Sequence, residues 1–410
     1  MKIDQLELEK FEAMVQKACA DQKEPGVIIL VKNDQGTVYE KCFGTMDVAT
    51  GAPCTIDTVV QLMSMTKAFT ALACMMLVEK GKLNLDTPVG EYVDAYKNPL
   101  VLTHWDEDGI PQLRRAKTDM TLRKLLSHTG GQSHEAYDPV RFRWNQTFGV
   151  EFGELSQHRA PLTFDPGTDW AYGQCMDLVM ECILAVDGNG RSWEQYLKDR
   201  IFTPLQLTST SFFPTPEMVR RTMPLHFVQE DGSLLSNTTE DIDSVWYGKG
   251  YRCAGREACN GLWSTARDYQ KLLSIFIGDG VSCNGIRFLQ KETIDEMRRN
   301  QIGDLQMHWG NGEPPCYTCF ATDPDFFYGQ QPAKWGLGFM VNEKISADGR
   351  GAGSLAWWGG GDTFFVADPD NRLSIVVLMQ NMPAARPISL NILRNTERQF
   401  HGLPVLELEP

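Results

Sequence analysis

The amino-acid sequence predicts an α/β (α+β) protein in which an antiparallel sheet is flanked by helices and a mostly helical lobe is inserted. Strand patterns occur at both ends of the chain, whereas helical patterns and irregular connections rich in Pro, Asp and Gly fill the middle. Strands from the two ends can pair in one sheet, so we expect a sheet domain at residues 1–67 and 255–410, with the lobe at 68–254. A ligand site would lie in the crevice between them.

The N-terminal elements begin with an amphipathic helix at residues 3–20. Residues 26–44 then read as two strands joined at Asp34-Gln-Gly36, which is typical of a hairpin turn. A helix is predicted from Met65 to Lys80, where Gly81 would end it, with Ser64 at its N-terminus. Two further helical patterns cover residues 122–127 and 176–186.

The C-terminal part returns to strand patterns. Four apolar segments, at residues 335–343, 354–358, 363–370 and 372–381, predict antiparallel strands joined by tight turns. The clearest turn is the Asp-Pro-Asp-Asn stretch at residues 368–371. A last helix is predicted at residues 388–400.

Composition excludes several classes of function. The chain has 410 residues, 42% hydrophobic and 22% charged, with a net charge of −14, which disfavours nucleic acid and anionic membranes as partners. No stretch reaches the roughly 18 apolar residues of a membrane span, and the N-terminus lacks the apolar core of a signal peptide, so we expect a cytoplasmic protein. Eleven cysteines then predict mostly reduced thiols. Cys316 and Cys319 form a lone C-x-x-C pair, so no metal site and no cofactor are expected.

One lysine lies inside an otherwise apolar helical stretch. Ser64 and Lys67 are three residues apart, so on a helix they share one face. A lysine in a dry site would have a lowered pKa and could act as a base toward the serine. The S-x-x-K pattern is short, and a lysine can also extend from apolar neighbours to water, so the pattern alone leaves both interpretations open.

Two later stretches carry further candidates. Tyr172 follows a Pro-Gly turn and precedes a helix, where a phenol could shuttle a proton or could simply pack at the helix start. Gly359, Gly360 and Gly361 interrupt an aromatic strand, which indicates a close approach of backbone or a plain β-bulge. A strand-edge N–H there, together with the N–H of Ser64, could form an oxyanion hole.

Taken in order, Ser64-Met-Thr-Lys67, Tyr172-Gly-Gln174 and Trp357-Trp-Gly359 resemble the motifs of one family. These are the class C β-lactamase-like serine hydrolases, which include penicillin-binding proteins, family VIII esterases and fungal acyltransferases. The resemblance runs from about residue 10 to 400. It is nearest to fungal acyltransferases of the statin-pathway type, and it implies the serine β-lactamase-like fold.

The resemblance implies roles for the matching residues. Ser64 would be the nucleophile, Lys67 the group that activates it, and Tyr172 the acid/base for the leaving group and the acceptor. The N–H groups of Ser64 and Gly360 would hold the oxyanion, with Gly359 or Gly361 as alternatives. The substrates would be a small-molecule acyl donor and an alcohol acceptor, and an acyl-carrier protein domain is a further candidate for bringing the donor.

Two departures from the family pattern favour neutral, apolar acyl substrates. The β-lactamases and peptidases carry an asparagine two residues after the tyrosine, where this chain has Gln174. Their Lys-Thr-Gly motif is here Trp357, Trp358 and Gly359, which offer no cation for a carboxylate. We therefore expect acyl transfer to an alcohol of a natural product. A carboxylesterase is the alternative, and a β-lactamase, a D-Ala peptidase or an inactive binding protein are weaker ones.

Further residues are candidates for supporting the site or contacting the substrate. His128 could serve as a triad base, but no G-x-S-x-G sequence occurs and the resemblance makes it a structural residue at a helix end. Aromatic residues crowd two probable loops, where they would either line a substrate pocket or pack the loops onto the body. The candidates for substrate contact are Trp246, Tyr247, Phe326, Trp357, Trp358 and Gln174.

Overall fold

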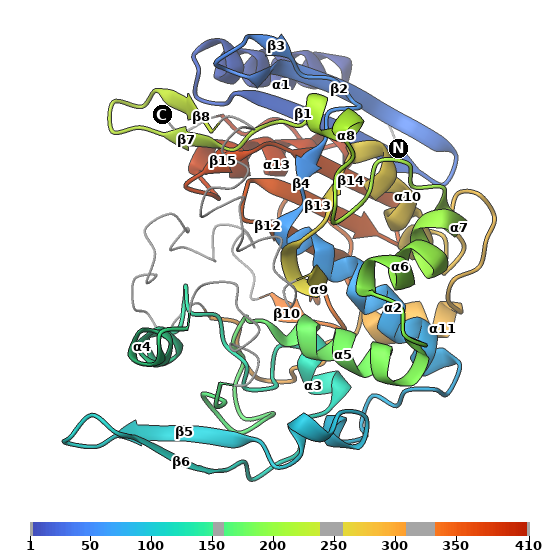
Figure 1. Cartoon of the computed structure of the whole chain (residues 1–410). Helices are drawn as coiled ribbons and strands as arrows, with labels where there is room; N and C mark the ends of the chain where they lie inside the picture. The colour runs from blue at the N-terminus through green and yellow to red at the C-terminus, as the bar shows by residue number, and fades with distance from the viewer. Residues whose placement is uncertain (1–2, 151–159, 238–256, 309–332, 408–410) are drawn as a thin grey trace.

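The computed structural model describes residues 3–150, 160–237, 257–308 and 333–407. Its centre is an eight-stranded sheet whose neighbouring strands are all antiparallel. The predicted α/β architecture, with an antiparallel sheet flanked by helices, is confirmed (Figure 1). In spatial order the strands are β10 (Lys334–Trp335), β11 (Met340–Val341), β12 (Leu355–Gly359), β13 (Thr363–Asp368), β14 (Leu373–Leu378), β1 (Gly26–Asn33), β2 (Gly36–Asp47) and β3 (Ala52–Pro53).

The two ends of the chain meet in the middle of this sheet. Strand β1 pairs with β14 on one side, with Ile28 opposite Leu378, and with β2 on the other. The β1–β2 hairpin turns where the sequence predicted it, because the Asn33 side chain accepts hydrogen bonds from the N–H groups of Gln35 (2.9 Å) and Gly36 (3.0 Å). Six consecutive residues at the start of β1 are buried, as expected for a strand covered on both faces.

Helices cover both faces of the sheet (Figure 1). On one face α10 (Ala266–Ile277) packs against β14, β1 and β13, and the Gln270 amide donates to the Leu30 carbonyl at 2.6 Å. On the other face α1 (Gln5–Ala20) and α13 (Pro387–Phe400) pack against each other, consistent with the helices predicted at both ends. Alternating residues of β13 follow this division, since Phe365 contacts Tyr269 of α10 and Phe364 points to the opposite side.

The segment that bears Ser64 runs beside the sheet. It comprises β4 (Val60–Gln61), the 3-10 helix η1 (Met63–Thr66) and α2 (Lys67–Glu79), and α2 packs on α5 (Cys175–Asp187) and α9 (Glu257–Asn260). Strand β4 pairs with β9 (Trp263–Ser264). The active-site candidates therefore lie between the main sheet and this helical layer. The predicted division of the chain at residues 67 and 254 remains a prediction.

Smaller elements complete the fold. Strands β5 and β6 form a separate two-stranded arm (Figure 1). Strand β15 pairs in parallel with β7, which pairs with β8. The bounds are β5 (Leu100–Trp105), β6 (Pro111–Arg115), β7 (His226–Val228), β8 (Leu234–Ser236), β15 (Asn381–Met382), η2 (Val89–Glu91), η3 (Asp94–Tyr96), α3 (Leu122–Leu126), α4 (Pro139–Phe148), α6 (Trp193–Leu197), the π-helical turn η5 (Lys198–Phe202), α7 (Thr203–Leu205), α8 (Pro216–Arg220) and α11 (Lys291–Met297).

Two further expectations concern the whole chain. Within the described residues, no helix is both long enough and apolar enough to cross a membrane. The eight cysteines that the structure describes are all free thiols, as the sequence predicted. Cys316 and Cys319 lie outside the described residues.

Candidate active site

Ser64 lies in a strained turn before α2. The sequence predicted an α-helix from Met65, but the chain forms the 3-10 helix η1 there and becomes α-helical only afterwards. Met63, directly before the serine, has a φ of 47°, a conformation that costs a non-glycine residue about 1–3 kcal/mol. Such strain persists only where the surroundings fix the backbone.

Hydrogen bonds on both sides of the serine fix this turn. The N–H of Leu62 donates to the carbonyl of Leu262 at 2.8 Å, and the N–H of Leu262 donates to the Thr66 hydroxyl at 3.2 Å. The phenol of Tyr269 donates to the carbonyl of Met65 at 3.0 Å. The nucleophile candidate is therefore held by residues some two hundred positions away in the sequence.

Lys67 lies one turn after the serine and is almost completely buried. Its Nζ donates to Ser64 Oγ at 3.2 Å and to the carbonyl of Cys259 at 3.1 Å. The same ammonium lies 4.8 Å from the centre of the Tyr172 ring. The structure thus brings together the three residues that the sequence predicted as catalytic, Ser64, Lys67 and Tyr172.

The charge state of Lys67 differs from the sequence-based expectation of a lowered pKa. Burial lowers the pKa of Lys67, but the negative charges that Tyr172, Cys259 and Asp177 carry when ionised outweigh it, so the pKa is raised. Burial also raises the pKa of the Cys259 thiol far above neutrality. Lys67 therefore stays an ammonium in this state.

Tyr172 is buried among aromatic rings, and its hydroxyl contacts a tryptophan. The indole N–H of Trp357 donates to the Tyr172 oxygen at 3.2 Å. Trp335 packs edge-on against the Trp357 ring, with 4.5 Å between the ring centres. The Tyr172 oxygen thus has an N–H donor on one side, and the Lys67 ammonium lies at the Tyr172 ring. This arrangement suits a group that gives and takes a proton.

His128 supports the backbone around Tyr172. Its carbonyl accepts from the N–H of Ala171 at 3.0 Å, and its Nδ1 accepts from the N–H of Gly173 at 3.3 Å. Burial first, and then the Lys67 charge, hold the pKa of His128 well below its usual value, so the ring stays neutral. His128 directly follows the end of α3 and has a φ of 58°, in keeping with a structural residue at a helix end.

The glycine-rich third motif forms the tight turn between β12 and β13. Gly360, Gly361 and Asp362 make the turn, and Asp362 has a φ of 59°. A Cβ on Gly359 would lie 2.2 Å from the carbonyl oxygen of Leu62, so only glycine fits there. The turn therefore packs directly against the backbone that leads into Ser64, where a second oxyanion donor is needed.

A buried acidic cluster anchors the same turn. Ser389 Oγ lies 2.8 Å from Asp362 Oδ2 and 2.9 Å from Glu24 Oε1, and the Arg386 guanidinium donates to Glu24 at 2.7 Å. A serine has one hydrogen to donate, so the second contact requires a proton on one of the two carboxyls. Burial, opposed by Arg386, raises the pKa of Glu24 to about 7 and also raises that of Asp362.

Asn260 is a neighbour of the nucleophile that the sequence analysis missed. Ser64 Oγ donates to Asn260 Oδ1 at 3.0 Å while it accepts from Lys67. In this state the serine proton points to the asparagine, and it must turn away before a base can take it. Asn260 lies far from the three motifs in the sequence, and no local pattern indicated its contact with Ser64.

The predicted substrate-contact residues differ in where the structure places them. Gln174 is buried, and neither atom of its amide has a hydrogen-bond partner among the described residues. Trp357 reaches Tyr172, whereas strand alternation turns Trp358 to the opposite face, where it stacks on Phe364. The structure therefore does not bring Trp358 to the site. The predicted contacts Trp246, Tyr247 and Phe326 lie outside the described residues.

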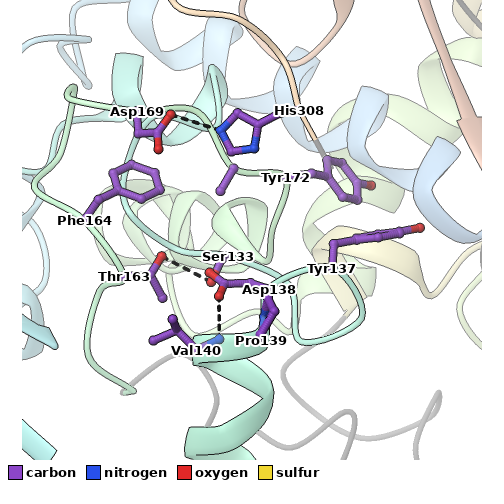
Figure 2. Close-up of a pocket in the computed structure, with 11 residues that line it drawn as sticks. Ser133, Tyr137, Asp138, Pro139, Val140, Thr163, Phe164, Asp169, Tyr172 and His308 are labelled. Carbon is purple, nitrogen blue, oxygen red and sulfur yellow. Dashed lines mark hydrogen bonds and ion pairs between the residues drawn. The ribbon is translucent and has the colours of Figure 1, made fainter. Parts of the chain in front are cut away.

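A cavity of about 110 Å³ opens beside Tyr172 (Figure 2). Its walls come from the start of α4, from the segment before Tyr172 and from His308, and they mix apolar side chains with hydroxyls, two carboxylates and an imidazole. The lining residues are Ser133, Tyr137, Asp138, Pro139, Val140, Thr163, Phe164, Asp169, Ala171, Tyr172 and His308.

The part of the chain that the structure describes holds no group of three or more His, Cys, Asp or Glu side chains placed to bind a metal ion.

Comparison with known proteins decides the family. The sequence profile described as Beta-lactamase matches residues 11–395, nearly the whole chain. The chain belongs to the beta-lactamase family. The resemblance inferred from the three motifs is thereby confirmed, and the protein is a serine-dependent enzyme with the beta-lactamase-like fold.

Relatives within this family include fungal enzymes of known name. Monacolin J acid methylbutanoyltransferase of Aspergillus terreus is 27% identical over 420 residues, covering 96% of this chain and 95% of that protein. Lovastatin esterase of Penicillium rubens is 26% identical over 405 residues, covering 95% and 96% of the two chains. Among solved structures, a mutant of simvastatin synthase from Aspergillus terreus superposes with a TM-score of 0.80, at 25% identity and 97% coverage of both chains.

The third motif of this site differs from the Lys-Thr-Gly motif of the β-lactamases and peptidases. The two tryptophans and the glycine carry no charge, and Trp357 is used to contact Tyr172 rather than a substrate carboxylate. The Lys67 ammonium donates hydrogen bonds to the serine oxygen and to the backbone carbonyl of Cys259. The arrangement can form and break an ester on Ser64, and the motif provides no charged anchor for a β-lactam carboxylate.

Proposed function

We propose that the protein is a serine acyltransferase. It takes an acyl group from a thioester or ester onto Ser64 and passes it to an alcohol of a natural product. Ser64 is the nucleophile in this proposal, Lys67 and Tyr172 form the proton-transfer pair, and the N–H groups of Ser64 and Gly360 hold the oxyanion. Gly359 and Gly361 are the alternatives for the second donor.

One observation carries the proposal. Ser64 Oγ accepts a hydrogen bond from a buried ammonium, Lys67, which also lies against the ring of Tyr172. A buried cation that contacts both the serine oxygen and a phenol ring is an arrangement that can activate a serine as a nucleophile. The relatives named as acyltransferases support transfer as the outcome.

The first half-reaction acylates the serine. Ser64 loses its proton to the Lys67/Tyr172 pair while its oxygen attacks the acyl carbonyl. The carbonyl π electrons move to the oxygen, which the two N–H groups stabilise. The bond to the thiol or alcohol leaving group then breaks, and Tyr172 returns the proton to that group.

The second half-reaction reverses the sequence with a new alcohol. The acceptor hydroxyl gives its proton to Tyr172 and attacks the acyl carbon, and the bond to Ser64 Oγ breaks. The product ester leaves and Ser64 regains a proton from the pair. Asn260 then accepts the serine hydrogen again, as in the resting state.

The site favours uncharged acyl groups. Trp357, Trp358 and Gly359 provide no cation for a carboxylate, and Lys67 is already engaged by Ser64 Oγ and the Cys259 carbonyl. The unpartnered amide of Gln174 is suited to a carbonyl or amide of the donor, because a buried amide without hydrogen bonds is costly unless a ligand satisfies it.

The test is a mass measurement of the intact protein. Mixing the protein with a short-chain acyl thioester should add one acyl group within seconds, and the Ser64→Ala variant should gain nothing. Adding alcohols should then discharge the adduct as an ester. If no thioester or ester, short or long, gives an adduct on the wild-type protein, the proposal is wrong.

Hydrolysis by the same acyl-enzyme is the second candidate, favoured by the likeness to lovastatin esterase. The two differ only in whether water or an alcohol discharges Ser64, which depends on how well the pocket excludes water. Measuring free acid and new ester in the same reaction separates them. Comparing free and carrier-bound thioesters at equal concentration tests the further proposal that an acyl-carrier protein brings the donor.

A further inference from the structure

The cavity beside Tyr172 contains a histidine whose hydrogen bonding is incomplete. His308 Nε2 lies 3.0 Å from Asp169 Oδ1, which also accepts from the N–H of Trp170 at 2.8 Å. A carboxylate only accepts hydrogen bonds, so the proton of the neutral ring is on Nε2 and Nδ1 is left as an acceptor. Nδ1 is buried, and no described residue donates to it.

The other polar walls of the cavity are also rich in acceptors. The hydroxyls of Thr163 and Ser133 lie 3.4 Å apart, and Figure 2 shows both beside the Asp138 carboxylate. Asp138 caps α4 by accepting from the N–H of Val140 at 2.8 Å. Among the described residues that line the cavity there is no lysine or arginine. A carboxylate would therefore meet like charge here, whereas a hydroxyl would find acceptors.

The position of the cavity relative to Tyr172 defines what would occupy it. The hydroxyls of Tyr172 and Tyr137 point away from His308 and Asp169, so the cavity lies at the other end of these two rings (Figure 2). A group bound in the cavity is thus about one tyrosine side chain away from the oxygen that exchanges protons. Since Tyr172 would serve the leaving group and the acceptor, the cavity belongs to the alcohol side and not to the acyl chain.

We propose that this cavity binds a second hydroxyl of the acceptor alcohol, with His308 Nδ1 accepting its hydrogen bond. The inference rests on the proposed acyl transfer and adds a substrate class to it: an uncharged acceptor with two separated hydroxyls, the distal one held by His308. Asp169 is a positioning residue, because it fixes the ring and its tautomer. Val140 and Phe164 are apolar residues of the cavity wall.

Three matched acceptors test this with a preformed acyl-enzyme. Discharge is timed by intact mass in the presence of cyclohexane-1,4-diol, 4-methylcyclohexanol or 4-hydroxycyclohexanecarboxylate. The diol should discharge Ser64 fastest and the carboxylate slowest. If the diol is no faster than the methyl compound, or the carboxylate is the fastest, the inference is wrong while the acyl-enzyme itself upholds the proposed function. If no acyl-enzyme forms, the proposed function is at fault instead.

Two variants then locate the effect. His308→Phe should reduce the advantage of the diol about 3- to 10-fold, the usual worth of a single neutral hydrogen bond, mainly through the acceptor KM. His308→Gln should restore part of it, because its amide oxygen also accepts. His104→Phe, a change at an exposed histidine of β5, is the matched control and should leave the ranking unchanged. A diol advantage that survives in His308→Phe would overturn the assignment to His308.

Discussion

Replacing Trp357 with phenylalanine tests whether the Tyr172 oxygen works as an anion. The change removes the indole N–H that donates to this oxygen at 3.2 Å but keeps an aromatic ring against Trp335. If Tyr172 has to lose its proton to act as a base, the missing donor makes that loss harder. The reaction should then require a higher pH.

The size of the effect follows from the strength of the lost bond. A hydrogen bond is worth about 1.5–3 kcal/mol to a charged group and about 0.5–1.5 kcal/mol to a neutral one, so the N–H favours the ionised oxygen by about 1–1.5 kcal/mol. Because ~1.4 kcal/mol corresponds to one pH unit, the rising limb of the kcat profile should move up by about one unit. Near pH 7 the rate should fall roughly tenfold and recover at higher pH.

The assay is single-turnover acylation followed by mass, at half-unit steps from pH 6 to 10. Trp193→Phe is the matched control, since Trp193 is equally buried but stacks on Tyr196 in another part of the protein. Its profile should keep the wild-type midpoint. A Trp357→Phe enzyme that is slowed by the same factor at every pH would refute the reasoning, because that pattern indicates a packing defect and not a lost donor to an ionising group.

Three further outcomes are expected. Ser64→Ala and Lys67→Ala should each abolish turnover while the circular dichroism spectrum stays unchanged. An active Lys67→Ala enzyme would show that Lys67 does not activate the serine. Wild-type activity should rise with pH as the Lys67/Tyr172 pair loses a proton, so a flat rate from pH 6 to 9, with chemistry rate-limiting, would contradict the pair's role. The pKa of Glu24 is about 7 in the folded state, against 4.5 ordinarily. The wild-type protein therefore loses stability as the pH rises from about 4.5 to about 7. The free energy of urea unfolding of Glu24→Gln should therefore rise by about 2.5 kcal/mol relative to wild type between pH 5 and 8, and a difference that stays constant would argue against the buried acid.

Much of the fold could be predicted because its signals are local. The turn after Asn33, the strands from Leu355 to Leu378 and the helices at both ends follow from apolar alternation, turn residues and caps. The 3-10 turn at Ser64 could not be predicted in this way. Local preference favours an α-helix there, and only contacts with distant segments hold Met63 at a positive φ.

The residues of the candidate site that belong to short sequence motifs could be predicted. The spacing of Ser64 and Lys67 indicated their contact, whereas no pattern indicated that Asn260 would accept from the serine. The direction of the Lys67 pKa was missed for a similar reason. Burial is predictable from an apolar helix, but the opposing charges of Tyr172 and Asp177 come from helices and loops more than a hundred residues away.

The order of strands in the sheet has a consequence for how the enzyme is made. Strand β1 is translated long before its partner β14 and the β12–β13 turn that packs before Ser64. The nascent chain must therefore carry an apolar β1 that pairs with β2 on one edge but stays open on the other until β14 is translated, a hazard for aggregation. Because of this order, Ser64, Lys67 and Tyr172 can all have been translated before the active site is complete. Catalysis begins only when the final strands close the sheet, so truncation before Leu378 should leave an inactive chain.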